Sequence, residues 1–63
     1  MSRTLPAIGA PATRALEAQG VRTLDDVARW TREDLLALHG VGPRAIRILE
    51  EALADQGLSL ASP

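Results

Sequence analysis

Apolar residues recur three or four positions apart along most of this chain, and glycine, proline and threonine interrupt them at helix-sized intervals. This spacing is typical of amphipathic helices that each bury one stripe. No stretch alternates between apolar and polar residues for long enough to indicate a strand. The pattern therefore predicts an all-α fold in which four to five short helices share one core.

The first and last helices have the clearest boundaries. A helix is expected to begin at Pro11, because proline suits a first helical position, and to stop at Gly20. The longest helix is expected from Pro43 to about Gln56, with Gly57 just beyond its end. Glycine is favoured there because it adopts the left-handed conformation that closes many helices.

Two shorter helices are expected between them, each started by a threonine. Thr23 precedes Leu24-Asp25-Asp26 in an arrangement close to a capping box, and this helix ends near Trp30. Thr31 repeats the device and starts a helix through Leu38. Residues 58–63 form a tail, in which Leu58 and Leu60 can fold back onto the core.

The segment from Leu38 to Ile46 is the most informative one. It predicts that the chain reverses through Gly40-Val41-Gly42 before the helix that starts at Pro43. The first N–H groups of that helix have no intrahelical acceptor, and the helix dipole places partial positive charge there. The donors would be Gly42, Arg44 and Ala45, and a phosphate of a nucleic-acid backbone is the anion that such a site would take.

A weak internal repeat adds a second turn. Residues 5–12 echo residues 38–45, so that Ile8-Gly9 aligns with Val41-Gly42. Ala7 stands where the second copy has a glycine, and a residue with a Cβ enters left-handed conformations less easily. We expect one domain over residues 1–63, with a degenerate hairpin unit at 5–20, an intact one at 23–57 and the tail.

Length and composition exclude several classes. With 63 residues the chain supports one small core, and without cysteine it has neither a disulfide nor a thiolate metal site. No apolar run approaches the roughly 20 residues of a membrane span, and no signal-peptide core is present. We therefore expect a cytoplasmic protein, associated with the nucleoid if it binds DNA, that contacts no membrane.

Nothing in the sequence supports catalysis, a metal site or a cofactor. The single histidine, His39, has no Cys or His partner and is expected to be exposed at a helix end. Adjacent pairs of carboxylates diverge on a helix, and those at helix starts are explained by the helix dipole. Trp30 is the only aromatic residue and is expected to cover an edge of the core or to contact a partner protein.

Charge is distributed unevenly along the chain. The net charge is −1, which is not typical of a strong nucleic-acid binder. Residues 1–23 and 39–48, which contain the two glycine turns, are nevertheless net basic, whereas 24–38 and 49–63 are net acidic. All the basic residues are arginines, which suit bidentate phosphate contacts and ordinary ion pairs alike.

The hairpin resembles the helix-hairpin-helix family, through Leu38-x-Gly40-Val41-Gly42 and the small residue Ala45. Residues 23–60 are also similar to the C-terminal domain of the bacterial RNA polymerase alpha subunit. They share the rhythm of Thr23-Leu24-Asp25-Asp26-Val27 and Thr31-Arg32-Glu33-Asp34-Leu35-Leu36, and the closing Gly57-Leu58-Ser59-Leu60. Two positions depart from that domain: Pro11 replaces its minor-groove arginine and Gly40 its hairpin asparagine.

The resemblance implies a tandem helix-hairpin-helix, SAM-like domain that binds DNA backbone without base specificity. Carried over by position, Gly40, Val41 and Gly42 would face phosphate with Arg44 as the nearby cation, and the Gly9 turn would make a weaker contact. Arg47 would either complete a phosphate clamp or pair with Glu50 or Glu51.

Two alternatives stay open. The hairpin can be a purely structural connector with Val41 in the core. The same scaffold can also serve as a protein-interaction or homodimerisation module, with transcription or DNA repair as the processes to which it could be linked.

Overall fold

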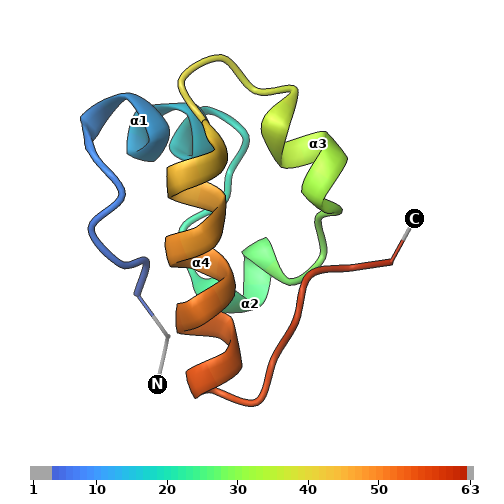
Figure 1. Cartoon of the computed structure of the whole chain (residues 1–63). Coiled ribbons are helices and arrows are strands. Elements are labelled where there is room, and N and C mark those ends of the chain that lie inside the picture. Colours follow the sequence, from blue (N-terminus) through green and yellow to red (C-terminus); the bar gives the residue numbers. More distant parts are fainter. Residues whose placement is uncertain (1–3, 63) are drawn as a thin grey trace.

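The chain forms four helices, described for residues 4–62 in a computed structural model (Figure 1). They are α1 (Ala10–Ala18), α2 (Leu24–Val27), α3 (Arg32–Leu36) and α4 (Pro43–Asp55). The longest helix, α4, runs through the middle of the molecule, and both α2 and α3 pack against it. The expected all-α class is confirmed, since residues 4–62 contain no strand longer than an isolated bridge.

Both threonine caps form as the sequence predicts. The Thr23 hydroxyl accepts a hydrogen bond from the Asp26 N–H (3.2 Å), and the Asp26 carboxylate accepts from the Thr23 N–H (3.3 Å). This is a complete capping box at the start of α2. At the start of α3, the Thr31 hydroxyl accepts from the Asp34 N–H (3.1 Å).

The two short helices are shorter than predicted. We expected α2 to reach Trp30 and α3 to reach Leu38, but they end at Val27 and Leu36. The reason is visible in the hydrogen bonds that follow. The N–H groups of Trp30 and Leu38 donate to residues three positions back, Val27 and Leu35, so the last turns tighten and leave the α-helical pattern.

Glycines end the two longer helices by the same device. After α1, the Val21 N–H donates to the Leu16 carbonyl and Gly20 has a φ of +77°. After α4, the Leu58 N–H donates to the Leu53 carbonyl and Gly57 has a φ of +72°. Both are Schellman closures, which turn the chain back toward the core and confirm the predicted stops.

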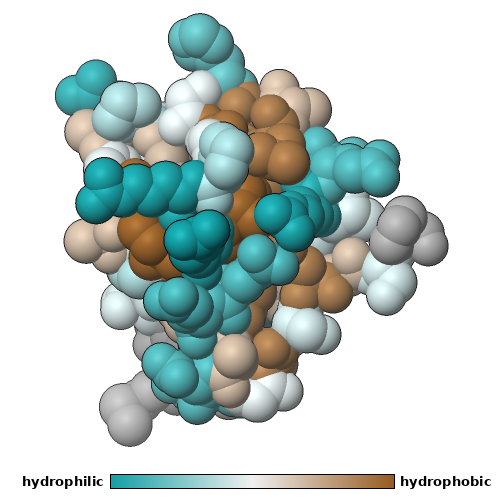
Figure 2. All heavy atoms as spheres, viewed as in Figure 1, coloured by the Kyte–Doolittle hydropathy of each residue, from teal (hydrophilic) through white to brown (hydrophobic). Residues whose placement is uncertain are grey.

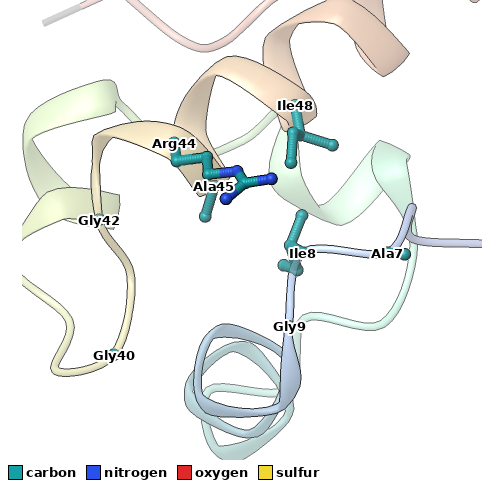
Figure 3. Close-up of a pocket in the computed structure, with 8 residues that line it drawn as sticks. All are labelled: Ala7, Ile8, Gly9, Gly40, Gly42, Arg44, Ala45 and Ile48. Atoms are coloured by element: carbon teal, nitrogen blue, oxygen red, sulfur yellow. The ribbon is translucent and has the colours of Figure 1, made fainter.

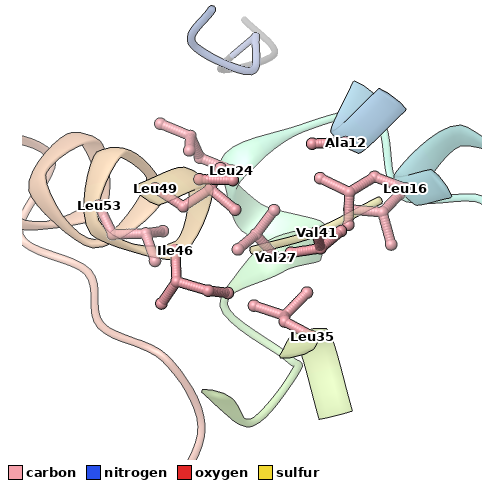
Figure 4. Close-up of a cluster of buried hydrophobic side chains, with 11 residues drawn as sticks. Ala12, Leu16, Leu24, Val27, Leu35, Val41, Ile46, Leu49 and Leu53 are labelled. Atoms are coloured by element: carbon pink, nitrogen blue, oxygen red, sulfur yellow. The ribbon is translucent and has the colours of Figure 1, made fainter. Parts of the chain in front are cut away.

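The core draws on all four helices and on the segments between them (Figure 4). Its buried members are all aliphatic: Ala12, Leu16, Val21, Leu24, Val27, Leu35, Val41, Ala45, Ile46, Leu49 and Leu53. Trp30, Leu58 and Leu60 are half-buried and pack against this cluster, as expected for the tryptophan and the tail.

Two bridges tie the ends of the described chain to the helical body. Thr4 pairs with Thr23, and Ala61 pairs with Thr31 and donates its N–H to the Trp30 carbonyl (2.9 Å). The tail therefore lies along the junction between α2 and α3. The two glycine turns lie at the other end of the molecule, where α1 and α4 begin (Figure 1).

Candidate functional site

The two glycine turns meet at one pocket of about 420 Å³ (Figure 3). They are about thirty positions apart in sequence, so only the fold brings them together. The first turn and the segment before it contribute one wall, and the second turn and the first two turns of α4 contribute the other. The lining residues are Ala7, Ile8, Gly9, Gly40, Gly42, Arg44, Ala45 and Ile48.

At Gly40 the second turn comes close to the backbone of α1. The turn is closed by a hydrogen bond from the Val41 N–H to the Leu38 carbonyl (3.2 Å), and within it Gly40 has a φ of +98°. A Cβ on Gly40 would lie 2.8 Å from the Pro11 carbonyl oxygen of α1. Glycine is thus required here for two separate reasons, its backbone conformation and its close approach to another helix.

Gly42 differs from Gly40 on both counts. It is the N-cap of α4, with an extended backbone (φ −111°, ψ 178°), and a Cβ there would meet nothing within 4 Å. Its carbonyl accepts the first hydrogen bond of the helix, from the Ile46 N–H (3.1 Å). The equivalent role in α1 belongs to Gly9, whose carbonyl accepts from the Thr13 N–H (3.0 Å).

The two turns are not conformational copies of each other. In the first, the positive φ (+94°) lies at the N-cap Gly9; in the second it lies two residues before the N-cap, at Gly40. Ala7, which aligns with Gly40, has a normal backbone, since no non-glycine residue in the described chain has a positive φ. The first turn, which has Ala7 in place of the first glycine, therefore adopts a different backbone conformation from the second turn.

The helix starts at the pocket are chemically unlike the other two. Neither α1 nor α4 has a side-chain cap or an acidic residue in its first turn, and each has a proline at one of its first two positions. By contrast, α2 and α3 each have a threonine cap and two acidic residues there. The helices that begin away from the pocket, α2 and α3, thus have acidic residues in their first turns. The two helices that begin at the pocket, α1 and α4, have none there.

Arg44 supplies the charge of the pocket. It is exposed in the first turn of α4, and Figure 3 shows its guanidinium reaching across the space between the turns toward Ile8. Arg47 is exposed on the next turn of α4 and does not line the pocket. Neither arginine makes an ion pair with a carboxylate within residues 4–62, so the alternative that paired Arg47 with Glu50 or Glu51 is not seen in that part of the chain.

Five of the seven predicted site residues therefore line one pocket. They are Gly9, Gly40, Gly42, Arg44 and Ala45. Ala45 is 6% exposed, so only its backbone N–H can serve a ligand. The Val41 side chain is also 6% exposed and lies in the core, so it does not face a ligand. The alternative that placed Val41 in the core describes its side chain, and its place in the predicted binding set stays a prediction for its backbone alone.

Ile8 and Ile48 were missed, although both had a signal. Ile8 precedes Gly9 as Val41 precedes Gly42, and Ile48 follows Arg44 by four positions, on the same helix face. Both are half-buried and form an apolar floor. In Figure 2, apolar atoms are visible between the N-terminal segment and α4, with hydrophilic atoms lying across them.

The remaining candidates are accounted for without a site. His39 is exposed, as predicted. Among residues 4–62, no three His, Cys, Asp or Glu side chains come together in a way that could hold a metal ion. In the same residues, no helix is both long and apolar enough to cross a bilayer.

Comparison with known protein families, with curated proteins and with solved structures finds no match to this chain. The function of the site is therefore inferred from its own geometry.

Proposed function

We propose that this protein is a small, non-enzymatic DNA-binding module of the tandem helix-hairpin-helix type. In this proposal it contacts backbone phosphates, without base specificity, through the N–H groups at the starts of α4 and α1. Arg44 provides the nearby cation, and the turn at Gly9 makes the weaker second contact.

The observation that supports this function most directly is the difference between the two pairs of helix starts. A side-chain cap stabilises a helix, and α2 and α3 both have one. The two helices that open on the pocket have none, which leaves their first N–H groups to water or to an external anion. Arg44 reinforces the site because a guanidinium pairs well with phosphate.

Binding of this kind should be weak and sensitive to salt. With one or two phosphates neutralised, the logarithm of the binding constant should fall with the logarithm of salt concentration with a slope of about −1 to −2. The net charge of −1 adds no general attraction for DNA. We therefore expect dissociation constants in the range typical of non-specific binding, about 10⁻⁴ to 10⁻⁶ M.

The test is fluorescence anisotropy of a labelled generic duplex at about 50 mM salt with up to about 100 μM protein, a range chosen to cover non-specific affinities. Arg44→Glu should abolish binding. Arg32→Glu is the matched control, because it makes the same change in charge on an exposed residue that does not line the pocket. Absence of binding by the unmodified protein, or equal loss in both variants, would contradict the proposal.

A protein-interaction or homodimerisation module is the second candidate. It is favoured by the apolar floor formed by Ile8 and Ile48, since a phosphate makes no use of aliphatic side chains. Leu36, 39% exposed on α3, is a further apolar contact. Sedimentation equilibrium separates the candidates: a stable dimer whose DNA affinity does not change on Arg44→Glu would favour this second function.

A further inference from the structure

We infer that Gly40 is a positioning residue that fixes the distance between the two helix starts, so that the two turns act as one two-point site. The inference rests on the proposed function and deepens it. It assigns to Gly40 a role different from direct phosphate contact: the residue holds the start of α1 against the start of α4.

The evidence is the close approach of two backbones. The ideal Cβ position on Gly40 lies 2.8 Å from the carbonyl oxygen of Pro11 and 3.1 Å from its carbonyl carbon. Real Cβ atoms do not come this close, and the obstacle is backbone, so no rotation of a side chain can relieve it. Any residue larger than glycine must therefore move the turn away from α1.

Such a movement acts on the two binding elements together. Pro11 is the second residue of α1, one position after Ala10, and Gly40 is two residues before the N-cap of α4. Both turns line the same pocket. A ligand that binds both helix starts is sensitive to their separation, because a geometric mismatch leaves one of them without its phosphate.

The other glycines provide matched controls for backbone strain. Gly57 also has a positive φ (+72°), but a Cβ there meets nothing within 4 Å. Gly57→Ala therefore introduces unfavourable φ without a clash, whereas Gly40→Ala introduces both. Gly20→Ala is a second control of the same kind, since Gly20 has a φ of +77°, a Cβ there also meets nothing within 4 Å, and the residue does not line the pocket.

The experiment compares the three variants in duplex binding across a salt series, with thermal unfolding measured on each. Gly40→Ala should lower affinity by about tenfold or more, since a charge-assisted hydrogen bond to phosphate is removed. Its salt slope should become shallower by about 0.9 for each phosphate that is no longer neutralised. Gly57→Ala and Gly20→Ala should lose only the stability that an unfavourable φ costs, less than Gly40→Ala loses, and their salt slopes should be unchanged. An unchanged slope for a folded Gly40→Ala protein overturns the inference.

If Gly40→Ala fails to fold, Gly40→Asn replaces it and Gly57→Asn becomes its control, because asparagine tolerates positive φ better than alanine. The clash with Pro11 remains in the asparagine variant. The salt slopes of duplex binding for Gly40→Asn and Gly57→Asn are then compared, and an unchanged slope for a folded Gly40→Asn protein overturns the inference.

A measurement without DNA separates failure of this inference from failure of the proposed function. In the unmodified protein, amide exchange at Thr13 and at Ile46, the first hydrogen-bonded residues of α1 and α4, should report one shared opening free energy. In the Gly40 variant, Thr13 should exchange faster while Ala61, bonded at the opposite end, should not. Independent opening in the unmodified protein overturns the inference. If the unmodified protein binds no duplex, the proposed function fails and this exchange result alone decides the positioning role.

Discussion

Replacing Gly42 by aspartate should stabilise the protein and at the same time remove its affinity for DNA. The N-cap of α4 already has the extended backbone that a capping residue adopts, and a Cβ there meets no neighbour within 4 Å. The same geometry is used at the N-cap of α2, where the Thr23 hydroxyl accepts from a helix N–H. An aspartate at position 42 can therefore accept from the N–H groups of α4.

The stabilisation can be estimated from three contributions. An aspartate cap exceeds a glycine cap by only a few tenths of a kcal/mol. Its charge at the positive end of the helix contributes about 0.3–1 kcal/mol, and removing a glycine from the unfolded chain about 0.4–1 kcal/mol. The sum is about 1–2 kcal/mol, and in a domain of this size each kcal/mol raises Tm by about 4–8 °C.

The loss of binding follows from the same N–H groups. The new carboxylate would accept from the donors assigned to phosphate and would repel the phosphate itself. Thermal unfolding and duplex anisotropy on one preparation measure both effects. Gly42→Ala is the control that lacks the carboxylate: it keeps the backbone N–H and shares only the contribution from removing a glycine from the unfolded chain, about 0.4–1 kcal/mol. A variant that gains stability yet keeps its DNA affinity would refute the assignment of these N–H groups. A variant that gains no stability would refute the interpretation of α4 as uncapped.

Three further results are expected from the helical body. The pKa of Asp26 is lowered, mainly by the hydrogen bond from the Arg22 N–H and also by those from Thr23. The stability that this carboxylate contributes is therefore complete above its unfolded pKa and is lost as pH falls through its lower folded pKa, so Asp26→Asn should flatten the acid side of a denaturation curve measured against pH. Thr23→Ala should cost about 1 kcal/mol in urea unfolding, the usual cost of losing such a cap, and a change below the error of the fit would show that the capping box contributes nothing in solution. Leu49→Ala should cost about 2–5 kcal/mol, because the side chain is fully buried, whereas Leu36→Ala should stay within about 0.5 kcal/mol; equal losses would show that the core is not where the structure places it.

The features that sequence predicted well are those determined within a few residues. The caps at Thr23 and Thr31 and the stops at Gly20 and Gly57 are local hydrogen-bonding patterns, and all four appear in the structure. The ends of α2 and α3 were placed two or three residues too late. Their apolar spacing continues past Val27 and Leu36, but the hydrogen bonds after these residues join positions three apart, so the chain leaves the α-helical pattern earlier than the spacing indicates.

The pocket could be predicted only in part, because it depends on packing between distant segments. The sequence repeat pointed to both turns, and five predicted residues line one pocket. It did not indicate that the turns would face each other, that Gly40 would approach Pro11, or that the positive φ of the first turn would lie at Gly9. These are consequences of how α1 lies against the segment before α4, which no local pattern encodes.

The division between capped and uncapped helix starts connects the fold to the proposed function. A chain of 63 residues has a small core and little stability to spare, so each unused cap is a measurable fraction of its folding free energy. If the caps were missing only by chance, they would be expected anywhere in the fold. Instead both uncapped starts adjoin one pocket, beside an arginine with no carboxylate partner in the described chain. A Gly42→Asp variant that gains stability and loses DNA binding would therefore show that the hairpin is a binding site. A purely structural connector would gain the stability without any change in binding.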